Sequence, residues 1–173
     1  MKRISLSAFG IAVLGGVAAF VIPAFGQATG EPIFVQKIPP GYRDWKLVSV
    51  AREEGPPLDD IRAILGNDTA IKAYRKGKLP FPEGAIIARL AWSYDANEEN
   101  NKAFGRRQSF VAGHPKNGVQ FMIKNAKKYA ATGGWGYGHF EDGKTAEASM
   151  LRTCHPCHQA IEARDFVFTK YAL

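Results

Sequence analysis

Two cysteines and a histidine close to the C-terminal end carry the clearest chemistry in the sequence. Residues 154–158 read Cys-His-Pro-Cys-His, and Cys154 and Cys157 are the only cysteines of the 173-residue chain. The spacing C-x-x-C-H is the attachment signature of c-type haem. Each thiol can add to one vinyl group of the porphyrin, and the histidine that follows can ligate the iron from the proximal side. The motif therefore predicts a haem c that is tethered by Cys154 and Cys157, with His158 as the iron ligand.

Two other interpretations of the cysteine pair are weaker. A redox disulfide of the thioredoxin type starts a helix after a strand in the N-terminal half of its domain, whereas this pair lies near the C-terminus. A structural zinc site needs four ligands. His155, His114 or His139 would have to supply the fourth, and no second C-x-x-C or H-x₃-H pattern supports such a site.

The N-terminal segment has the features of a secretory signal in their usual order. Two basic residues open the chain, an apolar uncharged run follows over residues 8–22, and small residues then offer cleavage after Gly26 or Ala28. The run is shorter than the ~20 residues that cross a bilayer as a helix, although an uncleaved anchor is the alternative. We predict a cleaved signal peptide at residues 1–28 and export to the periplasm, where c-type haem is attached in bacteria.

The composition fits one globular domain over residues 29–173. Hydrophobic residues make up 46% and charged residues 23% of the chain, which excludes long disorder and a polytopic membrane protein. Removal of the signal leaves 21 basic and 16 acidic residues, so the net charge falls from +7 to +5. The basic residues form no long run, and no nucleic-acid partner is expected. After signal cleavage no membrane contact is expected either.

Strand and helix signals alternate along the rest of the chain. A β-branched and aromatic run predicts a strand over residues 85–94, and Gly136 and Gly138 indicate a tightly packed strand over residues 135–140. Short connections favour antiparallel pairing, so the predicted class is α+β, a β-rich antiparallel sheet with flanking helices. The other expected elements are a strand or short helix at 42–50, a helix or strand at 59–65, a capped helix at 70–76, a loop or hairpin tip at 97–102, strands at 108–112 and 119–124, helices at 125–131 and 145–153, and a strand or extended segment at 165–172.

The second axial position of the haem has no obvious ligand in the sequence. Met122 lies in an apolar predicted strand, and Met150 precedes the motif on the proximal side. His114 and His139 are further candidates, each more typical of a surface or loop position. The sequence therefore favours a five-coordinate iron that is open to small molecules over a closed His/Met site that only transfers electrons.

Several segments resemble the cytochrome P460 family, which includes cytochrome c′-beta. They are Tyr42-Arg43-Asp44-Trp45, the Pro-Phe-Pro-Glu-Gly turn at residues 80–84 and the strand after it, the aromatic run at 135–140, and the haem motif followed by Asp165-Phe-Val-Phe-Thr-Lys-Tyr171. The resemblance implies a β-rich fold, often a homodimer, and a largely five-coordinate haem. Some members oxidise hydroxylamine, and others bind nitric oxide or carbon monoxide without known turnover.

The resemblance also points to individual residues. Members with the unusual chromophore carry a lysine linked to the porphyrin on the strand after the glycine turn, and the corresponding residue here is Arg89. Arginine stays protonated and is a poor nucleophile. Arg89 can instead donate hydrogen bonds to a haem propionate or an iron-bound ligand, or it can be an ordinary outward-facing residue. Lys76 or Lys78 would take the lysine's place only with a shifted alignment.

A distal pocket lined by aromatic residues is implied as well. Phe81, Trp92 and Phe110 are candidates for it, although each also fits a plain core position. Asp165 stands before the last predicted segment, where it can relay protons to a bound ligand, cap a turn or pair with Arg164.

Together these features predict an exported c-type haem protein that oxidises or binds small nitrogen compounds such as hydroxylamine or nitric oxide. A non-enzymatic gas-binding protein and a periplasmic electron carrier are the alternatives. The expected partners are a small-molecule ligand, a redox protein and a second copy of the chain.

Overall fold

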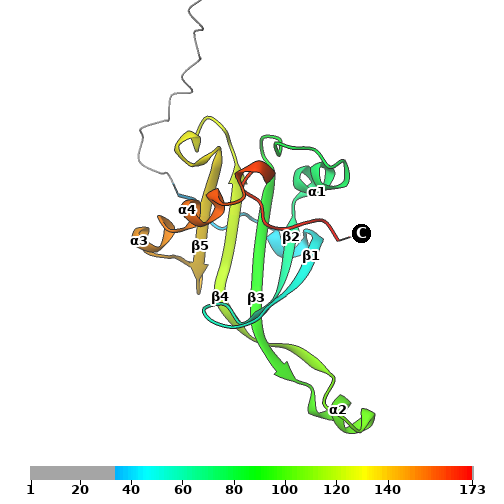
Figure 1. Ribbon diagram of the computed structural model, residues 1–173. Coiled ribbons are helices and arrows are strands. Elements are labelled where there is room, and N and C mark those ends of the chain that lie inside the picture. Colours follow the sequence, from blue (N-terminus) through cyan, green and yellow to red (C-terminus); the bar gives the residue numbers. More distant parts are fainter. Residues whose placement is uncertain (1–33, 173) are drawn as a thin grey trace, which may run out of the picture.

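The computed structural model describes residues 34–172, so the predicted signal peptide at residues 1–28 lies outside the described residues. Within residues 34–172 six strands form one antiparallel sheet in the order β1-β2-β3-β4-β5-β6, which is a simple meander (Figure 1). No helix in this part of the chain is long and apolar enough to cross a membrane. The predicted α+β class with a β-rich antiparallel sheet is confirmed. The strands are β1 (Lys46–Glu53), β2 (Asp60–Gly66), β3 (Ile86–Ala96), β4 (Phe110–Lys124), β5 (Trp135–Glu141) and β6 (Lys144–Thr145).

Short helices connect or follow the strands. Asn67 caps α1 because its side-chain oxygen accepts a hydrogen bond from the Ala70 N–H at 2.9 Å. The same oxygen accepts from the Ile86 N–H at 3.1 Å and so ties the helix to β3. The helices are α1 (Asp68–Arg75), α2 (Glu98–Phe104), α3 (Ala148–Leu151) and α4 (Cys154–Gln159), with single 3-10 turns at Tyr42–Asp44, Ala130–Thr132 and Glu162–Arg164.

Four expectations about these elements are corrected. Residues 97–102 do mark a hairpin tip, but they belong to α2, which Asn97 caps and Gly105 ends. The helix expected at 125–131 is a series of turns that ends in one 3-10 turn. The strands expected at 108–112 and 119–124 are parts of one strand, β4. The helix expected at 145–153 is limited to α3.

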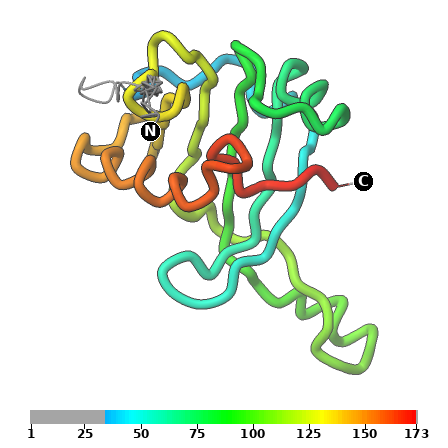
Figure 2. Tube along the Cα trace, turned by 45° about the horizontal axis from the view of Figure 1, so that its top comes forward, coloured from blue at the N-terminus to red at the C-terminus, as the bar shows by residue number. Residues whose placement is uncertain are grey.

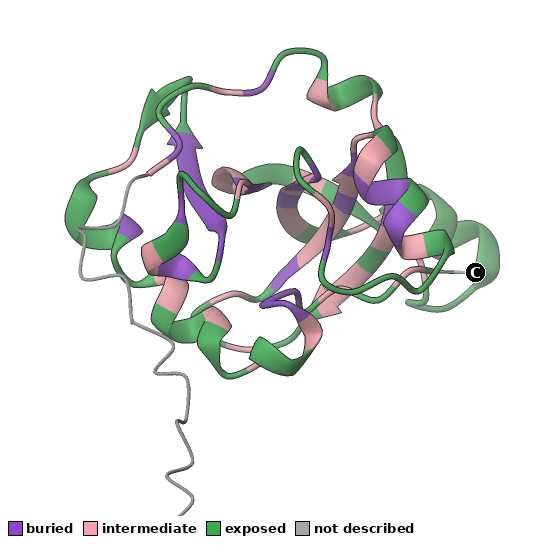
Figure 3. Ribbon diagram, turned by 90° about the horizontal axis from the view of Figure 1, so that it is seen from above, coloured by how far each residue is buried: buried purple, intermediate pink, exposed green. Residues whose placement is uncertain are grey.

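The two faces of the sheet carry separate hydrophobic cores. On one face Ile64, Ile87 and Tyr137 pack against α1 and against Phe166 and Val167 of the C-terminal segment. On the other face Phe121 and Phe140 pack against residues of the N-terminal arm such as Val35. Figure 3 shows that the buried residues lie on the sheet and on the segments packed against it, whereas the helices expose most of their outer surface.

The C-terminal segment turns at Asp165 and Phe166, and residues 167–172 then run in an extended path across the first face. It runs from α4 over the strands to the far edge, where the Ala172 N–H donates to the Val48 carbonyl at 2.9 Å (Figure 2). Helices α3 and α4 lie at the β5 side of the same face, and α1 lies toward the opposite side (Figure 1). The strand or extended segment expected at 165–172 is thus extended and without strand pairing only over residues 167–172, because residues 165 and 166 form a turn. The face between α1 and α4 is the one that positions the candidate site.

Candidate haem-binding site

Helix α4 carries the whole Cys-His-Pro-Cys-His motif. In a helix, positions i, i+3 and i+4 lie on one side, so that Cys154, Cys157 and His158 are neighbours on the helix surface. Cys154 is half-buried and Cys157 is exposed, and both thiols are free. Burial raises the pKa of the Cys154 thiol above its ordinary value, and the neighbouring Cys157 adds to this effect. The local structure therefore presents two unpaired thiols one turn apart, as a double thioether attachment requires.

The imidazole of His158 is fixed by one backbone contact. Its Nδ1 lies 2.7 Å from the carbonyl oxygen of Phe166. A carbonyl oxygen only accepts, so Nδ1 carries the hydrogen and the neutral ring keeps its lone pair on Nε2. Burial lowers the pKa of His158, although the bond to Phe166 opposes this shift, so the neutral form is favoured. A neutral imidazole with a fixed N–H and a free nitrogen is the form that binds metals.

Aromatic contacts place α4 over strand β5. The Tyr137 ring centroid lies 5.1 Å from that of His158 and 6.0 Å from that of His155. On its other side His158 meets the Phe168 ring edge-on at 5.1 Å. Tyr137 pairs with Met122 in the neighbouring strand, and Met122 pairs with Ile87, so these three side chains form an apolar row beside the motif.

A polar row follows next to this apolar row on the same face. Alternate residues of a strand share a face. Two positions away from each member of the apolar row, in the same direction on the sheet, lie Arg89, Gln120 and His139. The strand register places Arg89 opposite Gln120 and Gln120 opposite His139. Gln120 Nε2 lies 3.3 Å from His139 Nδ1, which connects two members of the row. A row of hydrogen-bonding side chains thus crosses the sheet one step away from the motif helix.

Arg89 is held in this row by a buried carboxylate. Its Nη2 donates to Oδ2 of Asp60 at 2.5 Å, and Asp60 has no exposed surface. Arg62 Nε donates to the other oxygen of Asp60 at 2.8 Å. Burial lowers the pKa of Arg89 from its ordinary value, with the nearby Arg62 second in effect. Arginine titrates so far above neutral pH that Arg89 stays charged.

Several buried polar atoms without a hydrogen-bond partner belong to residues of the two rows or to residues packed on the same face. Buried polar groups in folded proteins are nearly always hydrogen-bonded, and such exceptions mark places where a further group can bind. Among residues 34–172 these atoms include Arg89 Nη1, Tyr137 Oη, Trp135 Nε1, Tyr74 Oη and His155 Nδ1. Burial also raises the pKa of Tyr137 and Tyr74 above their ordinary value, so both phenols keep their hydrogen.

Asp165 lies in a different environment from Arg89. Its Oδ1 accepts from Lys124 Nζ at 2.6 Å, and its Oδ2 accepts from the Phe81 N–H at 2.7 Å. The two residues named from the sequence as distal candidates therefore have separate partners, Asp60 for Arg89 and Lys124 for Asp165. The proton-relay role of Asp165 stays a prediction.

The structure does not bring the three aromatic candidates together. Phe81 is buried in the core of the site face, where its ring meets those of Tyr74 and Trp135. Trp92 packs against the core on the opposite face. Phe110 stacks on Tyr94 in the β3-β4 hairpin, with ring centroids 4.4 Å apart.

The candidates for a second axial ligand are also dispersed. Met122 is partly buried at the edge of the site-face core, and Met150 is exposed at α3. His114 is exposed in the hairpin. His139 is buried and belongs to the polar row. In residues 34–172 no three His, Cys, Asp or Glu side chains converge on a common metal position.

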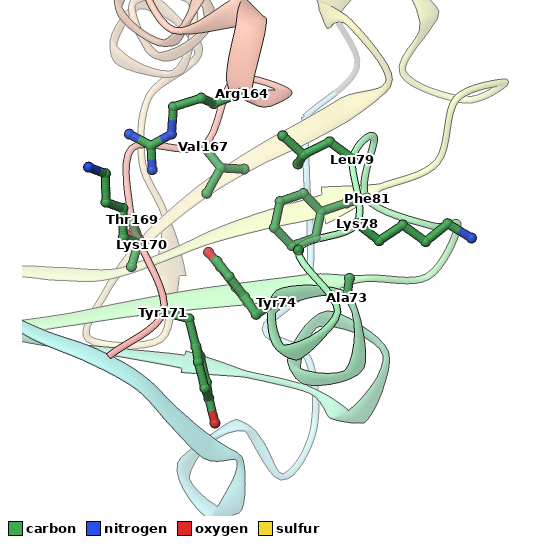
Figure 4. Close-up of a pocket in the computed structure, with 11 residues that line it drawn as sticks. Ala73, Tyr74, Lys78, Leu79, Phe81, Arg164, Val167, Thr169, Lys170 and Tyr171 are labelled. Atoms are coloured by element: carbon green, nitrogen blue, oxygen red, sulfur yellow. The ribbon is translucent and has the colours of Figure 1, made fainter. Parts of the chain in front are cut away.

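A cavity of about 190 Å³ adjoins the C-terminal segment near α1. Tyr74 and Phe81 form one wall of it, and Arg164, Val167 and Lys170 come from the segment that follows the motif (Figure 4). None of the motif residues lines this cavity, so it is separate from the thiols and from His158.

Sequence reasoning missed Asp60, Gln120 and Lys124. Gln120 and Lys124 carried a weak signal, because both alternate with Met122 on one face of a predicted strand. Asp60 carried none, because its role depends on two arginines that only the sheet brings together.

The fold and the motif define a class, an antiparallel β-sheet protein with a haem-attachment helix laid over one face. The family model described as Cytochrome P460 matches residues 39–169, which is most of the chain, and the chain belongs to this family. No curated protein matches it. The family indicates a c-type haem protein and implies haem c as the cofactor.

The residues present fit this cofactor. Two free thiols stand one turn apart, His158 has its lone pair on Nε2, and unpartnered polar atoms lie on the adjoining sheet face. Cys154, Cys157 and His158 are accordingly the residues that would hold a haem.

Proposed function

We propose that this chain is an exported c-type haem protein that binds or oxidises small nitrogen compounds such as hydroxylamine or nitric oxide. In this proposal Cys154 and Cys157 attach the haem covalently and His158 ligates its iron. The single observation that carries it is the 2.7 Å contact from His158 Nδ1 to the Phe166 carbonyl, because it leaves Nε2 as the metal-binding atom. A haem bound there supplies an iron that takes up small ligands and exchanges electrons with them.

Arg89 supplies a fixed positive charge in the proposed site. Asp60 occupies Nη2 of its guanidinium, whereas Nη1 has no partner among residues 34–172. A donor that is already oriented loses little freedom when it binds an acceptor. Arg89 Nη1 thus serves as a hydrogen-bond donor for a propionate or for an anionic ligand.

His139 lies between the polar row and an exposed carboxylate. If Gln120 Nε2 donates to Nδ1, the hydrogen of the neutral imidazole sits on Nε2. Nε2 lies 3.3 Å from Oε1 of Glu141, whose side chain is 64% exposed.

Export through the segment at residues 1–28 is part of the proposal. It is supported by the basic start, the apolar run and the small residues of that segment, and by the need of c-type haem for attachment outside the cytoplasm. A redox partner protein and a homodimer are further expectations. Light scattering on the purified protein tests whether it forms a homodimer.

One expression experiment tests the attachment. The full chain is produced in a bacterium that matures c-type cytochromes, and periplasmic protein is stained for haem after denaturing electrophoresis. Wild type is expected to retain haem, and Cys154→Ala/Cys157→Ala is expected to lose it. Haem that survives denaturation in the double variant refutes the assignment, and a wild type that is found only in the cytoplasm refutes export.

The reaction is tested on the same material. A spectral change of the ferrous protein upon addition of nitric oxide supports an open iron site, whereas a low-spin spectrum in both oxidation states refutes it. Reduction of an artificial acceptor that depends on hydroxylamine supports an enzyme. Its absence, together with nitric oxide binding, favours a non-enzymatic gas-binding protein.

A further inference from the structure

A buried ion pair beside the motif has no role in the proposed function so far. Lys124 Nζ lies 2.6 Å from Oδ1 of Asp165, and the two side chains are only 7% and 8% exposed. Lys124 is the last residue of β4, and Asp165 follows the 3-10 turn after α4. Burying two charges costs free energy unless the remaining hydrogen-bonding atoms are satisfied as well. The segments that this ion pair connects therefore indicate its role.

Further contacts satisfy both partners. Lys124 Nζ also donates to the Gly133 carbonyl at 3.3 Å, and it lies 5.0 Å from the ring centroid of Trp135. Oδ2 of Asp165 accepts from the Phe81 N–H at 2.7 Å. The pair thus joins three segments that are distant in sequence: the end of β4, the turn before β3 and the segment that follows the motif.

The backbone that this pair holds is strained. Asp165 and Phe166 have φ values of 52° and 64°, so two consecutive non-glycine residues adopt the left-handed conformation. Such a conformation costs free energy and persists only where tertiary contacts impose it. Lys124 and the Phe81 N–H hold Asp165, and the Phe166 ring lies against Gly133, where a Cβ atom would overlap it.

The strained turn presents the atom that orients His158. The carbonyl oxygen of Phe166 is the partner of His158 Nδ1 at 2.7 Å. A hydrogen bond to the outer nitrogen of a metal-ligating histidine fixes the ring and makes the imidazole a stronger donor to the metal. We propose that Lys124 and Asp165 are positioning residues for His158, which act by fixing the Phe166 carbonyl. This inference rests on the proposed function and deepens it, because it names what controls the iron–histidine bond.

The proposal differs from a merely structural role in what it predicts. A structural ion pair changes the stability of the fold and nothing else. A positioning pair also changes the iron–histidine bond in protein that remains folded. When the hydrogen bond from Nδ1 weakens, the imidazole donates less to iron, and the ferrous state is favoured.

Five variants separate the two roles. Asp165→Asn keeps the shape and the acceptor for Phe81 but removes the charge, and Lys124→Met/Asp165→Asn leaves no unpaired charge. Lys124→Arg restores a cation at the same place and serves as the conservative rescue. Asn97→Ala is the matched control, because it removes the cap contact to Asn100 and destabilises helix α2 in the β3-β4 hairpin, away from residues 164–166. Lys127→Met, an exposed neighbour, controls for surface charge.

The measurements are the iron–histidine stretching frequency of the ferrous protein by resonance Raman spectroscopy and the midpoint potential, both on haem-loaded protein whose fold is checked by circular dichroism. We expect a lower frequency and a higher potential in Asp165→Asn and in the double variant. We expect values closer to wild type in Lys124→Arg, and unchanged values in both controls. Wild-type frequency and potential in the two Asp165 variants overturn the positioning role, as does an equal shift in Asn97→Ala. A wild type without covalent haem counts against the proposed function instead.

Discussion

Asp60 and Arg89 form an ion pair across strands β2 and β3, with 2.5 Å between Oδ2 and Nη2. The carboxylate is fully buried, and it also binds Arg62 at 2.8 Å through its other oxygen. One buried acid therefore bridges two arginines on the face that carries the candidate site, and Arg62 also pairs with Glu53 at 3.4 Å. This arrangement leaves Arg89 charged, oriented and with a free Nη1.

Replacement of Asp60 by Asn is expected to destabilise the protein strongly. It leaves the charges of Arg89 and Arg62 without their shared counter-ion, and their side chains are only 13% and 12% exposed. Loss of one partner of a buried ion pair costs ~3–5 kcal/mol. Urea unfolding followed by circular dichroism measures the loss. Asp68→Asn is the control, because its pair with Lys46 is exposed, and its unfolding midpoint should match wild type. Equal midpoints for the two variants contradict the role given to Asp60.

Replacement of Gly133 by Ala is expected to be more harmful than the same change at Gly77. Both glycines have left-handed backbones, with φ values of +65° and +58°. A Cβ at Gly77 meets open space, so the change should cost only the ~1–2 kcal/mol of that conformation. A Cβ at Gly133 also overlaps the Phe166 ring, which adds roughly 1–3 kcal/mol of overpacking. Chemical denaturation of both variants compares them, and equal losses refute the close packing of Phe166 on Gly133.

Local sequence signals predicted much of the sheet. The β-branched run at residues 85–94 is β3, and the Gly-rich aromatic run is β5, in which Gly136 makes room for the Tyr129 ring. The cap at Asn67 predicted α1 correctly. Each of these signals lies within a few residues of the element that it specifies, so no tertiary information was needed.

The failures occurred where a segment lacks hydrophobic periodicity or where one local signal conflicts with another. Helix α2 has no apolar periodicity and is defined by its caps at Asn97 and Gly105. The stretch after Lys124 has helix-forming residues, but Asn125 accepts from the Lys128 N–H and forms a turn that buries Tyr129. The single long strand β4 passes through Pro115 and a left-handed Asn117, which resemble a break when the sequence is considered alone.

The candidate site could also be predicted only in part. The motif at residues 154–158 could be recognised from spacing, and the chain's membership of the cytochrome P460 family agrees with it. Asp60 and Lys124 could not be assigned, because each acts through a partner that is 29 or 41 residues away in the sequence.

The two motif thiols are expected to react at different rates in the haem-free chain. Cys157 is exposed, whereas Cys154 is half-buried and burial raises its pKa. A raised pKa means less thiolate at a given pH, and the thiolate is the reactive form. At pH 8 iodoacetamide should therefore modify Cys157 first, and the rate at Cys154 should still rise at a pH where an ordinary thiol has levelled off. Peptide mass spectrometry measures both rates. Unfolding in urea should abolish the difference, and equal rates in the native chain contradict the half-buried position of Cys154.

Replacement of Arg89 by Met is expected to weaken the binding of an anionic ligand to the ferric, haem-loaded protein. The change removes a charged donor with a free Nη1, and a hydrogen bond to a charged group contributes ~1.5–3 kcal/mol, so the azide affinity should fall by at least about tenfold. Arg89→Lys keeps the charge but loses the planar fork, and it should retain part of the affinity. Spectral titration with azide gives the dissociation constants. Arg106→Met, at an exposed arginine in the hairpin, is the control and should bind azide as wild type does. Wild-type azide affinity in Arg89→Met would show that Arg89 does not contact the ligand and acts only as the structural partner of Asp60.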